Sequence, residues 1–281
     1  MIRRTLYDIL NMQNFDAAHE LRKLKEMFEK EKVAYIRGVG SCSFYNCISD
    51  EWFRHFPDRR RYTSLYELQS DMKRICMFLH YDSLNELLLY CEFVKFVLAQ
   101  CMMSREYASF SFIENARILE EQMERILEAS NHQWLCQEDG SWIVIEKNPV
   151  ALEVAEIVPD EKTSTKILEY NHFELKGDIE GKKAILKSLG DAIEPITKTK
   201  EWKSSAYTSL GSDVGYLLNN FNIRHNNTEG VHKKNYISEM PTEELEQWYD
   251  KTYECILAVI ILNEQLKTGA EIKRVKALME Q

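Results

Sequence analysis

Glycine and proline are scarce in this chain, and their scarcity limits its fold more than any other feature of the sequence. Only 10 of the 281 residues are glycine and 5 are proline. Sandwiches and barrels need many short strands joined by tight turns, and such turns depend on these two residues. Hydrophobic residues make up 44% of the chain and charged residues 29%, which is the balance of a globular protein. We therefore expect a mostly helical, all-α fold.

Apolar residues recur at helical spacing over most of the chain. In the first such segment Phe15, Ala18, Leu21, Leu24 and Phe28 follow one another at steps of three and four residues. The same pattern predicts helices at residues 15–32, 65–79, 84–103, 106–129, 150–157, 160–171, 178–193 and 200–220, and a last helix that starts with Thr242 as its cap and reaches Leu262. Residues 35–45, which contain Gly38 and Gly40, are interpreted as a loop.

One segment, residues 133–147, has the pattern of β-strands instead. Two short β-prone runs flank Asp139-Gly140, a dipeptide that favours a hairpin turn. Asn148 and Pro149 then suit the cap and the first position of a new helix. We therefore predict an N-terminal helical domain at residues 1–132, one small β-hairpin as a connector at 133–147, and a C-terminal helical domain at 148–281.

Cysteine usage and charge indicate the environment and the partners. The seven cysteines show no paired short spacing, and the first ten residues lack the pattern of a secretory leader, so we expect no disulfide framework and a cytoplasmic protein. The most apolar stretch, residues 255–262, is too short to cross a membrane. The net charge of −9 argues against a broad nucleic-acid-coating surface, but the basic runs at 54–61 and 224–234 could each line a narrow groove. No metal-ligand motif is present, and we expect no metal and no cofactor.

A polar cluster between the last two long helices is the strongest candidate site. Residues 219–228 contain Arg224, His225 and several asparagines, and His232 follows a few residues later. Arginine can hold a phosphate and histidine can take a proton from a 2′-hydroxyl, so this set suits phosphodiester chemistry. The same asparagines would equally suit a cap that ends a helix and has no other function.

Arg224, His225 and the distal His232 resemble the motif of the HEPN superfamily of ribonucleases and RNA-binding proteins, and its place near a C-terminal helix looks like abortive-infection proteins of the AbiJ type. The resemblance covers residues 148–281 and implies a HEPN-like helical bundle that forms a homodimer and cuts RNA without a metal. It implies that Arg224 stabilises phosphate charge, that His225 or His232 acts as base or acid, and that the substrate is contacted by Asn222, Asn226, Asn227, Lys233 and Tyr236. The family usually leaves fewer residues between the arginine and the histidine than the seven found here.

The sequence thus predicts a metal-independent endoribonuclease or RNA-binding effector in bacterial anti-phage abortive infection or toxin-type growth arrest. Its expected partners are RNA, a second copy of the chain, and a phage or antitoxin protein. The alternative is a non-enzymatic helical module that binds a protein partner.

Overall fold

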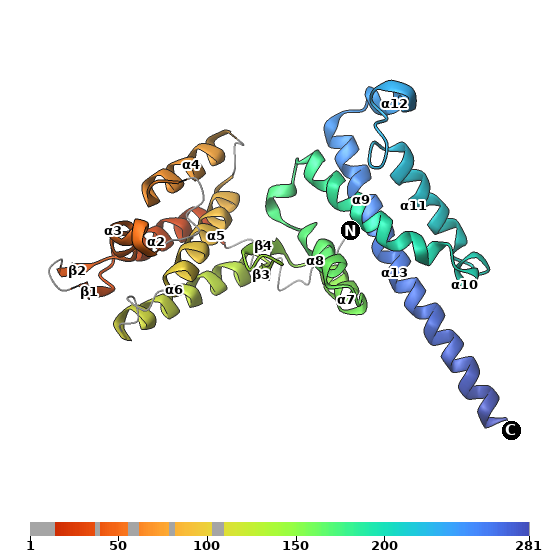
Figure 1. Cartoon of the computed structure of the whole chain (residues 1–281), viewed down its shortest axis with the longest axis horizontal. Helices are drawn as coiled ribbons and strands as arrows, with labels where there is room; N and C mark the ends of the chain where they lie inside the picture. The colour runs from red at the N-terminus through yellow and green to blue at the C-terminus, as the bar shows by residue number, and fades with distance from the viewer. Residues whose placement is uncertain (1–14, 37–39, 56–61, 79–81, 103–109, 281) are drawn as a thin grey trace. The chain divides into compact units, whose positions relative to one another are not determined.

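A computed structural model describes residues 15–36, 40–55, 62–78, 82–102 and 110–280 of the chain (Figure 1). Helices dominate it and its strands form only two-stranded antiparallel sheets, which confirms the predicted fold class. The chain divides into two compact units, one up to Glu146 and one from Lys147 onward. Each unit has a hydrophobic core of its own.

The first unit contains five of the described helices. They are α2 (Ala17–Glu29), α3 (Phe44–His55), α4 (Leu65–Phe78), α5 (Ser83–Met102) and α6 (Phe110–Ala129). Asp16 caps α2 by accepting a hydrogen bond from the backbone of His19 at 2.9 Å. Leu21, Leu24 and Phe28 of the predicted apolar stripe are buried, and Leu24 and Phe28 are fully inaccessible to solvent. Most of the basic run at 54–61 lies outside the described residues.

The segment at 35–45 is predicted to be a loop, but its described residues, 35–36 and 40–45, lie mostly in strands and at the start of a helix. Strand β1 (Ala34–Ile36) pairs antiparallel with β2 (Gly40–Cys42), and α3 then begins at Phe44. Cys42, at the end of β2, forms a disulfide with Cys47 in the first turns of α3. The expectation of no disulfide is therefore wrong at this pair, because the strand and the helix bring two cysteines together that are five residues apart.

The predicted hairpin is confirmed. Strand β3 (His132–Cys136) pairs with β4 (Trp142–Glu146), and Gly140 in the turn has a φ of 79°, which glycine adopts without steric cost. Val144 and Ile145 of β4 are buried, and the backbone N–H of Val144 donates to Glu92 of α5 at 2.6 Å. The hairpin consequently belongs to the first unit rather than forming a separate connector.

The second unit is a helical bundle. Its helices are α7 (Pro149–Ile157), α8 (Glu161–Glu169), α9 (Ile179–Thr197), α10 (Lys200–Lys203), α11 (Thr208–Asn220), α12 (Asn235–Ser238) and α13 (Thr242–Met279), with short 3-10 turns η2 (Phe173–Leu175) and η3 (Gly230–His232). Asn148 caps α7 and Pro149 occupies its first turn, as predicted. The single helix predicted for residues 200–220 is interrupted, because Ser205 bonds to Trp202 and to the backbone of Tyr207 in place of the helical ladder.

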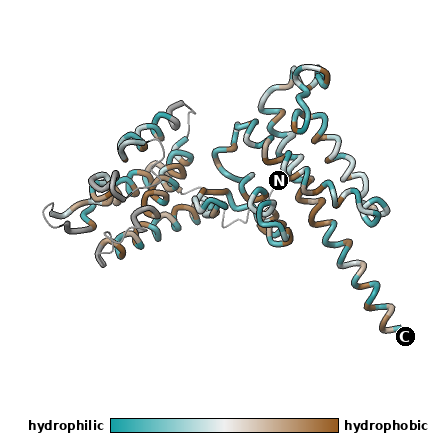
Figure 2. Tube along the Cα trace, in the orientation of Figure 1, coloured by the Kyte–Doolittle hydropathy of each residue, from teal (hydrophilic) through white to brown (hydrophobic). Residues whose placement is uncertain are grey.

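The last helix, α13, is the longest of the described helices, and it departs from the prediction at both ends. Thr242 is its first residue rather than its cap, since the carbonyl of Pro241 accepts the first helical hydrogen bonds. The buried face runs from Leu245 to Ile260, but the helix continues past Leu262 to Met279. This second half extends beyond the other helices of its unit and carries apolar residues among polar ones (Figures 1 and 2).

Candidate functional site

The end of α11 shapes the polar cluster. The helix ends at Asn220, and Asn222 has a φ of 60°, a left-handed conformation that asparagine tolerates better than most residues. The N–H of Arg224 then donates to the carbonyl of Leu218 at 2.8 Å. The asparagines therefore include the helix-ending cap that the non-functional interpretation expects.

Asn222 and Asn227 close the segment that follows. The N–H of Asn222 donates to Oδ1 of Asn227 at 2.7 Å, and the N–H of Asn227 donates to Oδ1 of Asn222 at 3.2 Å. The amide of Asn227 also donates to the carbonyl of His232 at 3.1 Å. Both side chains are buried, at 8% and 1% exposure. They build the loop from inside and do not present their amides to a substrate.

Three apolar side chains fix this loop to the core of the second unit. Phe221 and Ile223 at its start and Ile237 at its end are all buried. We call residues 221–237 the histidine loop. Because it is anchored at both ends and cross-linked by Asn222 and Asn227, its exposed side chains have a defined place on the surface.

Arg224 is held by helix α9. Its Nη2 contacts Oδ1 of Asp191 at 2.9 Å and Oε2 of Glu194 at 3.0 Å, and 18% of the side chain is exposed. The Nε atom is buried without a partner. No hydrogen bond joins Nη1 to any of the described residues. One edge of the guanidinium is therefore neutralised within the protein, while Nη1 has no carboxylate partner among those residues.

The carboxylate of Glu194 sits between two cations. A hydrogen bond from Lys198 lowers its pKa first, and the charge of Arg224 lowers it further. The sequence singled out neither Asp191 nor Glu194 as a functional residue, because acids on an exposed helix face are common and only the packing of α9 against α11 selects these two.

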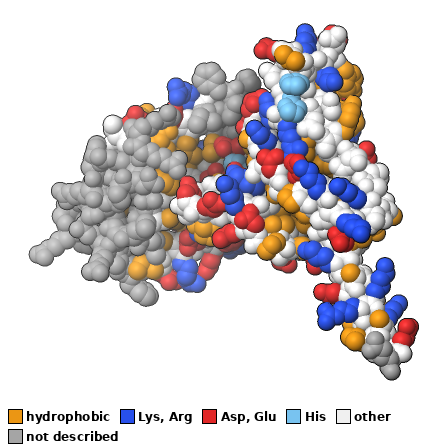
Figure 3. Space-filling view, turned by 45° about the vertical axis from the view of Figure 1, so that its right-hand side comes forward, with side chains coloured by type: hydrophobic (Ala, Val, Ile, Leu, Met, Phe, Trp, Pro, Cys, Tyr) orange, Lys and Arg blue, Asp and Glu red, His pale blue; other side chains and the backbone are white. Residues whose placement is uncertain are grey.

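His225 and His232 come together on the surface of the histidine loop. Their ring centroids are 5.0 Å apart with planes inclined by 31°, and both side chains are exposed. Histidine side chains lie together on this face of the second unit, with lysine and arginine side chains nearby (Figure 3). Two imidazoles at this distance can contact one small polar group, such as a phosphate, at the same time.

The other predicted contact residues differ in their availability. Lys233 is exposed. Tyr236 is 62% exposed and donates to Glu244 at 3.2 Å, and partial desolvation together with this carboxylate raises the pKa of the phenol. Asn226 is exposed, but its Oδ1 already accepts hydrogen bonds from Thr228 and Glu229. Of the five predicted contacts, Asn226, Lys233 and Tyr236 are exposed, whereas Asn222 and Asn227 are buried within the loop.

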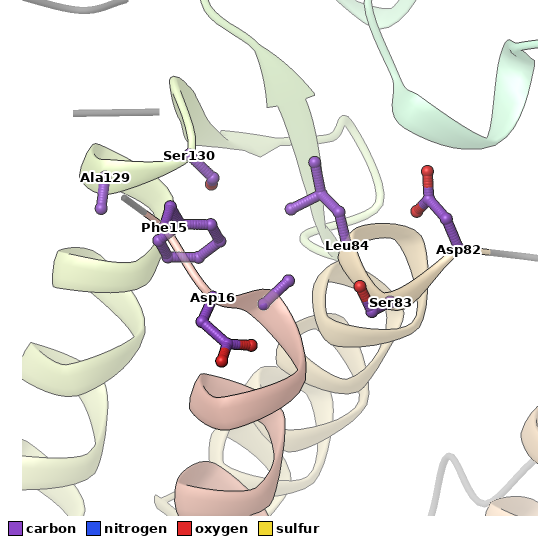
Figure 4. Close-up of a pocket in the computed structure, with 8 residues that line it drawn as sticks. Phe15, Asp16, Asp82, Ser83, Leu84, Ala129 and Ser130 are labelled. Atoms are coloured by element: carbon purple, nitrogen blue, oxygen red, sulfur yellow. The ribbon is translucent and has the colours of Figure 1, made fainter. Parts of the chain in front are cut away.

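A separate cavity of about 470 Å³ lies in the first unit, where the start of α2, the start of α5 and the end of α6 meet (Figure 4). Phe15 lies between these elements, and Asp16 and Asp82 stand at the rim. Both carboxylates already cap helices, since Asp16 accepts from His19 and Asp82 accepts from Asn85. The histidine loop, whose imidazoles have no such structural duty, is the better candidate.

Comparisons with protein-family models, curated proteins and solved structures find no match to this chain. Within the described ranges no group of three or more histidine, cysteine or acidic side chains is placed to hold a metal ion. No helix in that same part of the chain is both long and apolar enough to span a bilayer. The case for a function therefore depends on the geometry of the histidine loop and on the resemblance of its residues.

Proposed function

We propose that the histidine loop is a metal-independent ribonuclease site with His225 and His232 as its acid–base pair. The observation that carries the proposal is the 5.0 Å separation of the two exposed rings. The resemblance to the HEPN superfamily supplies the biological setting, which would be anti-phage abortive infection or toxin-type growth arrest in a bacterium.

The chemistry needs one base and one acid close to the same phosphodiester. A neutral imidazole takes the proton of the ribose 2′-hydroxyl while the 2′-oxygen attacks the phosphorus. The P–O bond to the 5′-oxygen breaks, and an imidazolium donates a proton to that oxygen. The products are a 2′,3′-cyclic phosphate and a 5′-hydroxyl end, and no metal or redox partner is required.

Arg224 would serve this site in two ways. Its Nη2 contacts with Asp191 and Glu194 hold the base of the histidine loop against α9. Its Nη1, which has no carboxylate partner in the described part of the chain, would stabilise negative charge on the phosphate, and Lys233 would attract the RNA backbone from the exposed side of the loop.

The test is cleavage of total RNA and of a defined oligoribonucleotide by the full chain in the presence of EDTA. We expect His225→Ala and His232→Ala each to slow cleavage by about 100-fold or more, in line with the usual contribution of acid–base catalysis. His19→Ala is the matched control, because His19 is an exposed histidine of α2 in the other unit and should leave the rate unchanged. Intact RNA in every lane, or equal rates for all four proteins, rejects the ribonuclease.

Protein recognition is the second candidate function. Val231 is 99% exposed and stands next to His232, and Tyr236 on the same loop is 62% exposed, so an apolar edge accompanies the imidazoles. A partner of phage or antitoxin origin would bury this edge. Photo-crosslinking from position 231 would identify such a protein, and Val231→Asp should weaken its binding by about tenfold.

A further inference from the structure

The second half of α13 carries apolar residues that nothing within the described residues covers. Residues 271–280 are exposed throughout, among them Val275 at 51% and Leu278 at 62% exposure. An isolated helical segment of this length is only marginally stable in water, because most helical stability in proteins comes from packing. A binding partner for this segment would stabilise it.

A small apolar pocket lies on α13, about five turns before Leu278. It has a volume of about 220 Å³ and is formed where Ile260 of α13 meets Ile193 and Ile196 of α9 and Val158 at the end of α7. Asp160, Glu264 and Lys267 stand at its polar rim. Ile260 and Leu278 are 18 residues apart, which is five turns, so they lie on the same side of the helix.

The face that joins the pocket to Leu278 is complementary to itself. Residues 260, 264, 267, 271, 274 and 278 follow at steps of three and four and share this face. Two copies of the helix, antiparallel about a two-fold axis at Gly269, would place Lys267 opposite Glu271 and Glu264 opposite Arg274. Because of the two-fold symmetry, each of these opposite-charge pairs occurs twice in the dimer. Leu278 of each copy lies opposite Ile260 in the pocket of the other copy.

We propose that the occupant of this pocket is the α13 tip of a second copy of the chain. Leu278 of each copy fills the apolar pocket of the other, and Arg274 approaches the acidic rim formed by Asp160 and Glu264. In the single copy Glu264 pairs with Lys267 at 3.0 Å, but the two side chains are 44% and 63% exposed and can exchange partners. This proposal is independent of the ribonuclease, because it uses no residue of the histidine loop.

The Glu264–Arg274 pair gives a charge-exchange test. The two residues are ten positions, or about 15 Å, apart on one helix and cannot reach each other within a copy. Sedimentation velocity of the full wild-type chain at micromolar concentration should show a dimer. Glu264→Lys should raise the dimer dissociation constant by about tenfold or more. The double variant E264K/R274E should dimerise more tightly than Glu264→Lys alone, because it restores the opposite-charge pair, although Asp160 on the same rim opposes full recovery. Circular dichroism and the unfolding midpoint verify that each variant is folded.

A pair of apolar variants tests which face is used. Leu278→Asp should abolish the dimer, whereas Ile272→Asp should not, because Ile272 is 50% exposed on the same helix but points away from the proposed face. A monomeric wild type overturns the proposal. So do a double variant that stays as weak as Glu264→Lys and a dimer that is lost with Ile272→Asp but not with Leu278→Asp.

Discussion

Asn222 and Asn227 each accept a hydrogen bond at Oδ1 from the backbone N–H of the other, five residues apart in the sequence. This reciprocal pair fixes the path of the chain between α11 and η3, and the further bond from Asn227 to the carbonyl of His232 joins it to the backbone of the residue that carries the second imidazole. The approach of His225 to His232 therefore depends on two side chains that face the core.

Replacing Asn227 should loosen the histidine loop. Asn227→Ala removes the acceptor of the Asn222 N–H and the donor to His232 in a position that is 1% exposed. Buried groups that lose their partners cost about 1–3 kcal/mol, so urea unfolding should show a loss of that size. The matched control Asn226→Ala, in an exposed turn, should cost clearly less. Equal losses for the two variants would contradict the structural role of Asn227.

The ion pairs of Arg224 should affect how steeply the stability of the protein falls at acidic pH. The pKa of Glu194 is lowered from its usual 4.5, first by the hydrogen bond from Lys198 and then by Arg224. A carboxyl group whose folded pKa is depressed stabilises the protein above its unfolded pKa, and that stability is lost as the pH falls toward the folded value. We expect Arg224→Met to make the decline of the urea midpoint below about pH 4.5 shallower without removing it, because Lys198 remains. A decline as steep as that of the wild type would show that Arg224 contributes nothing to it.

Removing the buried ammonium of Lys182 should destabilise the protein more than removing that of Lys183, the next residue on the same helix. Its Nζ lies 2.8 Å from Glu246 and 2.6 Å from Asp250, and only 8% of the side chain is exposed. The pKa of Glu246 is lowered overall: burial raises it, but the bonds from Lys182 and the Gly177 N–H outweigh that effect. Lys182→Met strands this carboxylate and should cost about 2–4 kcal/mol.

The control for Lys182 is Lys183→Met. Lys183 makes one loose pair with the exposed Glu180 at 3.6 Å, and pairs of this kind contribute about 1 kcal/mol at most. Chemical denaturation of both variants measures the difference. Similar losses of unfolding free energy for the two variants would mean that the ion pairs of Lys182 do not stabilise the bundle more than an exposed pair does.

Two glycines should respond in opposite directions to substitution by alanine. A methyl group at Gly190 would lie 2.6 Å from Cδ1 of Leu218, where α9 packs against α11, and such overpacking costs about 1–3 kcal/mol. At Gly269 of α13 a methyl group meets nothing within 4 Å, so Gly269→Ala should stabilise by up to about 1 kcal/mol through helix propensity. Thermal unfolding of the two variants tests the contrast. A stabilised Gly190→Ala would show that α9 and α11 move apart at little cost to accommodate the methyl group.

Short-range chemistry in the sequence determined the helical class, the hairpin turn at Gly140 and the cap of Asn148 on α7. These features depend on neighbouring residues, which a pattern of spacing and turn residues reveals directly. The sequence pattern did not predict the break between α10 and α11 or the strands β1 and β2. It favoured a continuous helix at the first place and a loop at the second. A few side-chain contacts and strand-pairing contacts outweighed these preferences.

Only the tertiary structure decided the composition of the candidate site. Arg224 meets Asp191 and Glu194, which are 33 and 30 residues away, because Gly190 lets α11 approach α9 closely. His225 meets His232 because Asn222 and Asn227 fold the intervening chain back. Such contacts are set by the packing of whole helices and by the closure of one loop, and residue spacing along the chain does not encode either of them by itself.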